Sequence, residues 1–466
     1  MHDTFATLNR MVMSFSLIQK YNVPGPRYTS YPTVPYWDEL NFDAETWQST
    51  MLQSFAESNS TEGISLYIHL PFCESLCTFC GCHKRITKCH DVEPPYITAV
   101  LKEWDLYCNL LPEKPVIKEI HLGGGTPTFF TPHNLETLIN GIFKRAERAA
   151  SHEFSFEGHP NNTTQAHLQT LYNLGFRRVS FGVQDYSDKV QKAIHRFQPL
   201  QKVKDVTEWA RVIGYTSVSH DLVFGLPFQK LDDVVDTITK TSILKPDRLA
   251  FYSYAHVPWL KGNGQRGFRD EDVPKDDEKR ILYEVGKYLL SKNGYHEIGM
   301  DHFALEDDTM FQASEEGKLH RNFMGYTSSK TQLMIGLGVS SISDSWYSFA
   351  QNEKSIENYY ALLEKNEIPI VKGHLLGAED LIIRRHILNI MCSFGTSWDI
   401  EHLYFPELPD VLDQLDEMEN DGLLIIKEKG LSITEKGRPF VRNICMAFDL
   451  RLKRKAPQTE LFSMTV

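Results

Sequence analysis

Residues 70–82 read Leu-Pro-Phe-Cys-Glu-Ser-Leu-Cys-Thr-Phe-Cys-Gly-Cys and place Cys73, Cys77 and Cys80 at the spacing C-x3-C-x2-C. A [4Fe–4S] cluster has four irons that each need a ligand, so three thiolates leave one iron open. S-adenosylmethionine can chelate such an iron through its amino and carboxylate groups. Transfer of one electron then breaks a carbon–sulfur bond and releases a 5′-deoxyadenosyl radical. We interpret these three cysteines as the ligands of a radical-generating cluster.

Two other interpretations of the cysteine loop remain open from the spacing alone. A structural zinc site usually joins two CxxC-type pairs across a longer loop, whereas Cys80 and Cys82 are only two residues apart. Buried, unreactive cysteines would not gather so closely. As a fourth ligand Cys82 would close the open iron, so we leave it unligated.

From residue 65 onward, short runs of β-branched and aromatic residues alternate with longer helical patterns. The predicted strands are 65–70, 116–122, 153–157, 178–183, 217–224 and 248–254. The predicted helices are 95–110, 132–149, 165–174, 187–213, 231–243 and 276–293. Six βα units in series predict an α/β fold with a parallel sheet, either open or closed into a full or partial barrel. In both cases we expect the active-site residues at the carboxyl ends of the strands.

The second predicted strand runs into residues 121–127, His-Leu-Gly-Gly-Gly-Thr-Pro. Glycines allow a ligand to approach the backbone closely, and their exposed amides can bind a carboxylate or an amino-acid group. A glycine triplet alone is more often a tight turn. One βα unit beyond a three-cysteine loop, it predicts a site for the methionine part of S-adenosylmethionine.

Polar residues also stand at later strand ends. Glu157 ends the third predicted strand, Gln184 follows the fourth and Asp221 lies in the fifth. Each singly could be a capping or ion-pairing residue, but together they indicate a ligand site at one barrel mouth. Arg196 is suited to a bidentate contact with a ligand carboxylate, and Phe79 either stacks on adenine or simply packs.

Composition excludes several classes of protein. The 466 residues carry a net charge of −12, which argues against a nucleic-acid partner. No apolar stretch reaches the ~20 residues of a membrane span, and residues 11–18 are not followed by a signal cleavage site. We expect a cytoplasmic protein with an amphipathic N-terminal helix.

The two ends of the chain differ from the central βα pattern. Residues 23–33 contain three prolines and a glycine and predict a shaped loop. After about residue 370 we expect a mainly helical domain, with helices at 378–393 and 408–421 and a hairpin over 423–434. We divide the chain into an N-terminal segment (1–60), a barrel (61–365) and a C-terminal helical domain (366–466).

The chain resembles the oxygen-independent coproporphyrinogen III oxidases, radical S-adenosylmethionine enzymes of heme biosynthesis. The resemblance runs from about Gln19 to Phe462; the cysteine loop and GGGTP indicate only the superfamily. More specific motifs are Cys82, YNVPGPRYTSYP (21–32), GVQD (182–185), DLVFGLP (221–227), YAH (254–256), GMDHF (299–303), RNFMGY (321–326) and RNIC (442–445).

The resemblance implies a partial (βα)6 barrel, an N-terminal segment that closes over the substrate, and two S-adenosylmethionine sites. The first site would use Tyr67, Gly124, Glu157 and Ile342. The second would use Phe79, Gly125, Thr126, Gln184, Arg196, Asp221 and Ala255. Among these residues and Cys82, catalytic roles are expected for Cys82, Tyr67 and Glu157. One departure stands at His159, where the family leads us to expect an acidic residue.

The implied reaction converts two propionates of coproporphyrinogen III into the vinyls of protoporphyrinogen IX. An electron donor and an electron acceptor are needed, and a monomer is expected. Arg27, Tyr28, Tyr31 and Arg321 are the side chains suited to the substrate propionates. The alternatives are a related heme chaperone, expected to lack Cys82 and the PGPRYTSYP segment, a radical methyltransferase on another tetrapyrrole, and a zinc-structured interaction protein.

Overall fold

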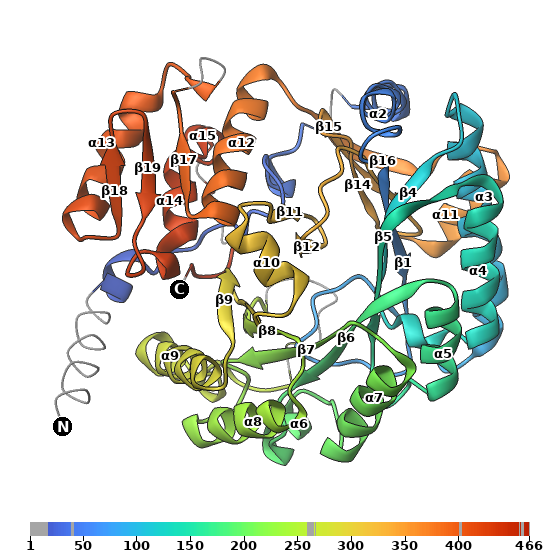
Figure 1. The fold of residues 1–466 in the computed structure, drawn as a ribbon, viewed down its shortest axis with the longest axis horizontal. Helices are drawn as coiled ribbons and strands as arrows, with labels where there is room; N and C mark the ends of the chain where they lie inside the picture. Colours follow the sequence, from blue (N-terminus) through green and yellow to red (C-terminus); the bar gives the residue numbers. More distant parts are fainter. Residues whose placement is uncertain are drawn as a thin grey trace.

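The computed structural model describes residues 17–38, 42–258, 265, 267–399, 403–455, 457 and 461–465. Its centre is a twelve-stranded sheet in the order β16-β15-β14-β13-β1-β4-β5-β6-β7-β8-β10-β9 (Figure 1). The strands from β13 to β8 in this order run parallel. Their bounds are Met334–Leu337 (β13), Ile64–Leu70 (β1), Val116–Gly124 (β4), Glu147–Gly158 (β5), Phe176–Gln184 (β6), Ser217–Phe224 (β7) and Arg248–Ser253 (β8).

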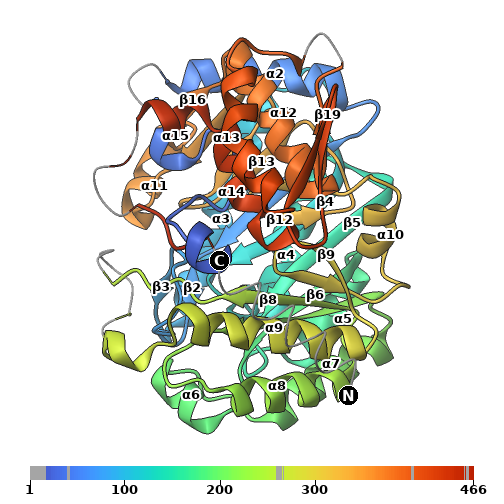
Figure 2. The same ribbon diagram turned by 90° about the vertical axis from the view of Figure 1, so that its left-hand side faces the viewer.

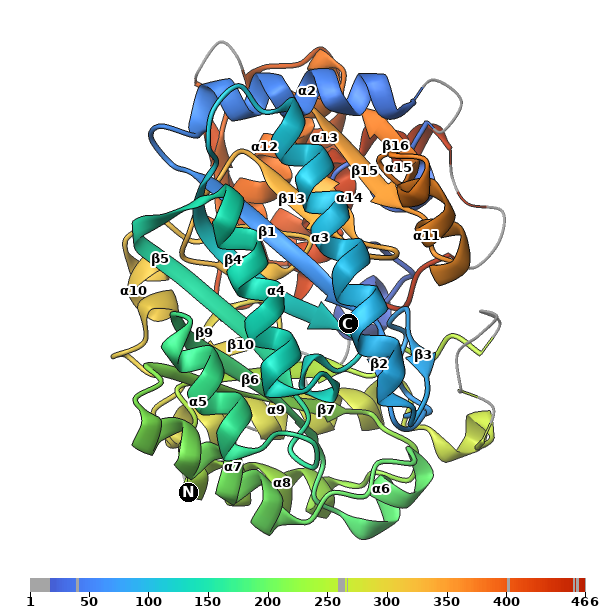
Figure 3. The same ribbon diagram turned by 90° about the vertical axis from the view of Figure 1, so that its right-hand side faces the viewer.

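Helices cover the outer face of the parallel strands, and Figure 3 shows several of them in front of the sheet. They are α3 (Glu93–Leu110), α4 (Pro132–Arg145), α5 (Gln165–Asn173), α6 (Asp188–Ala193), α7 (Leu200–Ile213), α8 (Leu231–Leu244) and α9 (Asp276–Lys292). Apolar residues of both layers form the main core. Each of the six strands from β1 to β8 is followed by helix, and the sheet does not close, so the predicted partial (βα)6 barrel is confirmed.

Two predicted helices are wrong in detail. The helix expected over 132–149 ends at Arg145 as α4, because residues 147–149 already belong to β5. The pattern over 187–213 is two helices, α6 and α7, joined by residues 194–199. Pro199 is the N-cap of α7 and has an extended backbone. Because proline has no backbone N–H to donate, one helix cannot run through this position. Gln191 and Gln198 hold the connection by reciprocal bonds: Gln191 Nε2 donates to the Gln198 carbonyl, and Gln198 N donates to Gln191 Oε1, each at 2.9 Å.

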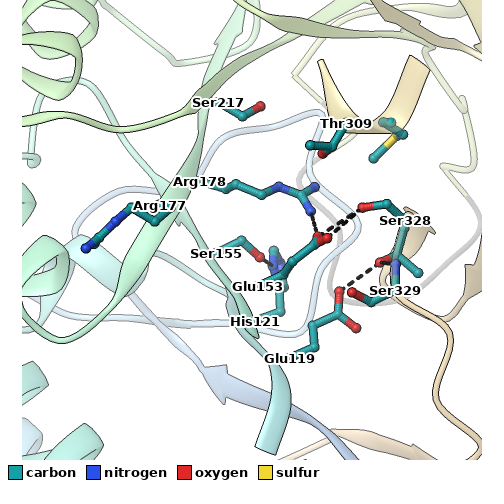
Figure 4. A network of polar contacts seen from close by, with 12 residues as sticks. Glu119, His121, Glu153, Ser155, Arg177, Arg178, Ser217, Thr309, Ser328 and Ser329 are labelled. Atoms are coloured by element: carbon teal, nitrogen blue, oxygen red, sulfur yellow. Dashed lines mark hydrogen bonds and ion pairs between the residues drawn. The ribbon is translucent and has the colours of Figure 1, made fainter. Parts of the chain in front are cut away.

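The inner face of the barrel is polar because alternate strand residues point inward. Glu119, Glu153 and Arg178, on β4 to β6, meet near the amino ends of the strands (Figure 4). Arg178 Nη1 lies 2.5 Å from Glu153 Oε2, and the Ser328 hydroxyl donates to the same carboxylate at 2.9 and 3.0 Å. The Thr327 hydroxyl donates to Glu119 at 2.9 Å. This network forms a polar floor and leaves a lumen suited to a polar ligand rather than a packed core.

Both edges of the sheet are antiparallel, which the sequence patterns did not predict. One edge adds β14 (Ile342–Asp344), β15 (Ser348–Asn352) and β16 (Ile370–Leu375); the other adds β10 (His302–Ala304) and β9 (His296–Gly299). These strands have three to six residues, too few for a clear alternation. Because β16 joins the sheet, the expected division at residue 365 falls before its last strand.

The C-terminal domain stands beside the barrel, in front of it in Figure 2. It holds α12 (Ala378–Ser393), α13 (Leu408–Asn420), α14 (Val441–Phe448), α15 (Leu450–Arg454) and a small sheet of β17 (Gly395–Ser397), β18 (Leu424–Lys427) and β19 (Gly430–Ile433). The predicted helices and hairpin are therefore confirmed.

The N-terminal segment packs between the C-terminal domain and the barrel. Residues 17–21 are helical, while the rest of the expected amphipathic helix lies outside the described residues. The helix α2 (Ala44–Ser58) then buries Trp47, Met51 and Phe55 in the main core. Removal of the first 60 residues would therefore uncover part of the barrel core.

Two buried arginines fix the backbone of residues 25–28. The Arg442 guanidinium donates to the carbonyls of Gly25 and Pro26, and also to those of Met464 and Thr465. Arg321 donates to the carbonyls of residues 27 and 28, each at 3.3 Å. We call this arrangement of Arg321, Arg442 and residues 25–28 the arginine clamp.

None of the described helices is long and apolar enough to cross a membrane.

Candidate functional site

The cysteine loop begins where β1 ends and lies at the carboxyl ends of the parallel strands. Residues 72–73 (β2) pair with residues 85–86 (β3), which anchors the loop at both ends. The Cys73 thiol lies 3.3 Å from the Thr126 hydroxyl, and Arg196 Nη1 lies 3.5 Å from the Cys77 sulfur. Lys84 donates to the carbonyls of residues 80 and 82, at 3.0 and 3.2 Å.

Cys73, Cys77, Cys80 and Cys82 line one pocket, which we call the cluster pocket. Other residues of the same lining are Gly124, Gly125, Thr126, Glu157, His159, Gln184, Arg196 and Asp221. Within the described residues, no three His, Cys, Asp or Glu side chains form a site for a single metal ion. A four-iron cluster is bulkier and takes its thiolates at separate corners, so three soft sulfur ligands around a pocket fit such a cluster.

Residues 123–126, which we call the glycine strip, pass against the cysteine loop and leave no space for side chains on the glycines. Gly125 N donates to the carbonyl of residue 70 at 2.9 Å, and Thr126 N donates to that of residue 72 at 3.0 Å. A Cβ on Gly125 would lie 2.6 Å from the Pro71 backbone, and Gly124 has φ +108°. Glycine is therefore required here, and the strip offers its backbone to a ligand in the pocket.

Arg196 points into this pocket with an unsatisfied donor. Its Nη2 donates to the carbonyl of Gly182 at 2.5 Å, while its buried Nε has no partner among the described atoms. A buried donor without an acceptor is costly, so this geometry suits a bound acceptor such as a carboxylate. Most of the site residues predicted from the sequence thus lie around one cavity.

The chain has close relatives among characterised proteins. Residues 67–240 match the family model of the radical SAM superfamily. The chain is 37% identical to the oxygen-independent coproporphyrinogen III oxidase of Synechocystis, with all of both chains covered. It is 37% identical to the Escherichia coli protein of that name, over 95% of this chain and 96% of the relative.

The chain belongs to the oxygen-independent coproporphyrinogen III oxidase family. The solved structure of coproporphyrinogen III oxidase from Escherichia coli, described as a radical SAM enzyme, agrees with this fold. It matches with a TM-score of 0.86 and 34% identity, over 91% of this chain and 97% of that one. The resemblance inferred from the motifs is therefore confirmed.

Three residues that the family resemblance assigns to cofactor binding stand outside the lining of the pocket, although all are described. The Tyr67 ring stacks on His121, 6.0 Å between centroids, in the next layer of the barrel. The carbonyl of Ala255 accepts a bond from Gln265 at 3.0 Å, and the same amide reaches the carbonyl of Phe79. Ile342 packs beside Trp37 in β14.

His159, where this family member departs from the expected acidic residue, lines the pocket. Its Nδ1 accepts a hydrogen bond from Asn161 N at 3.1 Å, so the neutral ring carries its proton on Nε2. Burial and then the nearby Arg196 lower its pKa well below the usual value. At neutral pH the ring thus offers a neutral N–H donor in place of a carboxylate acceptor.

Sequence patterns missed the inward histidines of the strands below the pocket. His121 Nδ1 lies 2.8 Å from the Ser155 hydroxyl, and its Nε2 lies 3.3 Å from Glu157 Oε1. The Tyr67 hydroxyl lies 3.2 Å from His69 Nδ1. Burial lowers the pKa of His69 to about 4, so this ring is neutral. Alternation along β1 and β4 was the signal that could have found both histidines.

A second cavity continues from the cluster pocket into the barrel. The two cavities share Glu157 and Asp221, and the second is also lined by His121, Tyr252 and His302. The Ser180 hydroxyl donates to Asp221 at 2.8 Å. Burial raises the pKa of Asp221 to about 7, so this carboxyl is readily protonated near neutral pH.

Proposed function

We propose that this protein is an oxygen-independent coproporphyrinogen III oxidase of heme biosynthesis. It would remove two propionate carboxyl groups of coproporphyrinogen III as CO2 and leave the two vinyls of protoporphyrinogen IX. The observation that carries the proposal is the thiol-lined pocket, with its glycine strip, which opens into a polar barrel lumen. The names of relatives that match over nearly the whole chain supply the substrate.

The chemistry requires a reagent stronger than an acid or base. A propionate is an unactivated chain, and no side chain at pH 7 removes its β-hydrogen. When bound, a [4Fe–4S] cluster and S-adenosylmethionine supply a primary carbon radical that can do so. The protein binds and orients the reactants and excludes water.

Each site residue then has a role in this scheme. Cys73, Cys77 and Cys80 would hold the cluster, while Cys82 stays unligated and takes part in turnover. The first S-adenosylmethionine would be held by Tyr67, Gly124, Glu157 and Ile342. The second would be held by Phe79, Gly125, Thr126, Gln184, Arg196, Asp221 and Ala255. The partnerless Nε of Arg196 supports the second site.

Of the four side chains suggested for the substrate, Tyr28 and Arg321 are bonded to other parts of the protein, and the buried Tyr31 hydroxyl has no partner among the described atoms. The Tyr28 hydroxyl donates to Asp449 at 3.1 Å, Tyr31 is buried, and Arg321 serves the arginine clamp. The Arg27 side chain is 31% exposed and lies 3.5 Å from Asp301. We therefore assign propionate binding to Arg27 and leave Tyr28, Tyr31 and Arg321 as residues that shape the closing segment.

Other features of the proposal rest on the sequence. We propose a cytoplasmic monomer without nucleic-acid or membrane partners, with an N-terminal segment up to about residue 60 and a barrel that extends past residue 365 to include β16. It needs one electron donor for the cluster and one acceptor for the substrate electron. The net charge of −12 supports the absence of a nucleic-acid partner.

An anaerobic assay tests the proposal. Reconstituted protein is incubated with coproporphyrinogen III, S-adenosylmethionine and dithionite, and the porphyrins are separated after oxidation. We expect protoporphyrin and about two CO2 per substrate. Heme uptake without CO2 release would indicate the chaperone, and methyl transfer without CO2 release would indicate a methyltransferase.

A further inference from the structure

The cysteine loop and the segment after α6 form one continuous surface. Thr78 N donates to the carbonyl of Ile194 at 3.0 Å, and the Thr78 hydroxyl donates to that of Ala193 at 3.1 Å. β2, β3 and α6 lie on the same side of the molecule in Figures 2 and 3. This surface includes the loop that carries the three proposed cluster thiols, so an electron from outside has a short path here.

The surface is basic although the chain is acidic. Residues 72–90 and 187–204 contain eight Lys or Arg and two Asp or Glu, against a net charge of −12 for the whole chain. Two of the eight are ion-paired with acidic residues outside these ranges, Arg85 with Glu357 and Lys204 with Glu208. Lys88, Lys189 and Lys192 are exposed. A local excess of positive charge on a negative protein attracts negatively charged partners selectively to that place.

The same segments also carry three large apolar side chains that are exposed. Leu76 is 38% exposed, Ile86 42% and Phe197 65%. The backbone of Phe197 is fixed, since Asn161 Nδ2 donates to its carbonyl at 2.8 Å and the next residue, Gln198, is buried. An apolar centre with a charged rim is the usual composition of a protein interface.

We propose that this face, formed by residues 74–78, 84–88 and 189–197, docks an acidic one-electron carrier protein. The inference rests on the proposed function, because cleavage of S-adenosylmethionine consumes an electron that the chain cannot generate. In the docked complex one electron leaves the reduced carrier and enters the cluster, and no bond is made or broken in that step. Redox complexes of this kind are small and transient, and charge sets their rate of association.

Charge reversal tests the docking surface. The triple variant Lys88→Glu, Lys189→Glu, Lys192→Glu avoids every residue assigned to the cluster or to S-adenosylmethionine. Its matched control is Lys292→Glu, Lys365→Glu, Lys427→Glu, which changes the net charge equally at exposed positions elsewhere. The probes are a purified acidic plant-type ferredoxin and an acidic flavodoxin, each titrated against the reconstituted protein at low and physiological salt.

We expect at least one probe to bind the parent and the control with similar, salt-sensitive affinity, and the face variant about tenfold or more weakly. Reduction of the cluster by that carrier, followed by electron paramagnetic resonance, should slow by a similar factor. Reduction by dithionite should be equal in all three proteins. If neither carrier binds, or if face and control variants lose affinity equally, the docking proposal is wrong.

Two further outcomes separate this inference from the proposed function. A parent protein without a dithionite-reducible cluster would contradict the proposed function itself. A normal cluster with no preference for the face would overturn only the docking surface. Self-association of the parent that the same charge reversals abolish would make the face a contact between two copies, and would also overturn the proposal.

Discussion

The cluster pocket and the arginine clamp are assembled in opposite ways. The pocket takes its main parts from two short contiguous stretches, residues 70–82 and 121–127, on neighbouring strands. The clamp joins side chains to carbonyls 293 to 417 positions away, since Arg321 and Arg442 bind the backbone of residues 25–28. A local site is visible in the sequence, whereas a site assembled over long range appears only in the fold.

This difference also separates two parts of the proposed function. The pocket is suited to generating a radical, which is chemistry common to a superfamily. The clamp holds the N-terminal segment against the barrel, where the substrate must be enclosed. Changes in the pocket should therefore abolish radical formation and with it product formation. Changes in the clamp should lower product formation while radical formation continues.

The largest expected effect follows from loss of one cluster ligand. Cys73→Ala removes one of the three proposed iron ligands, so the cluster should be lost and neither S-adenosylmethionine cleavage nor product should be detectable. Iron analysis and electron paramagnetic resonance measure the loss. Cys82→Ala is the matched control and should retain its iron with reduced turnover. Equal loss of iron in both variants would contradict the ligand assignment.

Loss of Arg442 from the clamp should lower product formation far more than S-adenosylmethionine cleavage. Arg442→Ala leaves four buried or half-buried carbonyls without their donor, at roughly 1–3 kcal/mol for each one that water does not reach. We expect the N-terminal segment to detach, with product formation at least about tenfold lower and S-adenosylmethionine cleavage retained. Limited proteolysis of the first 40 residues and the two assays measure this separation.

A conservative variant at the same position sharpens the test of the clamp. Arg442→Lys keeps the charge but not the planar fork that reaches several carbonyls at once. It should recover only part of the product formation. If Arg442→Ala loses both activities in parallel, the clamp is simply part of the stability of the fold.

Loss of Arg196 in the proposed second S-adenosylmethionine site should lower activity less than loss of a cluster ligand or of Arg442. Arg196→Ala removes a guanidinium with a free Nε, and loss of a charged hydrogen bond costs about 1.5–3 kcal/mol of binding. The variant should keep its iron and the first S-adenosylmethionine, and calorimetry should show one site in place of two. Two unaltered sites in the variant, or a single site in the parent, would overturn this assignment.

The sequence predicted the parts of the molecule that depend on neighbouring residues. The six βα units, the C-terminal hairpin and the residues of the cluster pocket follow from short patterns. It did not predict β13, because four residues containing a glycine resemble a loop until β1 lies beside them. The clamp was missed for a related reason: Arg321 looked suited to a propionate, yet its bonds go to backbone carbonyls that the tertiary structure brings within reach.

The smallest expected effect is on the pH dependence of the unfolding free energy, through His302 near the clamp. His302 borders the barrel cavity; its Nδ1 lies 2.8 Å from the Met300 carbonyl, and the Tyr252 hydroxyl lies 3.2 Å from its Nε2. Burial, and to a lesser extent Arg321, lowers the pKa of His302 to about 4 in the folded state. The unfolded chain binds this proton near pH 6.5, so stability falls as the pH drops from 6.5 toward 4.

At pH 5.5 the loss of stability from this one histidine is about 1 kcal/mol relative to neutral pH. His302→Asn keeps a donor for the Met300 carbonyl and removes the titrating ring, so its unfolding free energy should depend less on pH over this range. Denaturant unfolding at pH 7.5 and 5.5 measures the difference. His69→Asn is the matched variant below the cluster pocket, where burial also lowers the histidine pKa to about 4, and its unfolding free energy should likewise depend less on pH. Only His69→Asn should disturb the pocket, because His69 lies against Gly124 whereas His302 stands with the clamp. An unchanged pH dependence in both variants would mean that folding does not lower the pKa of either ring.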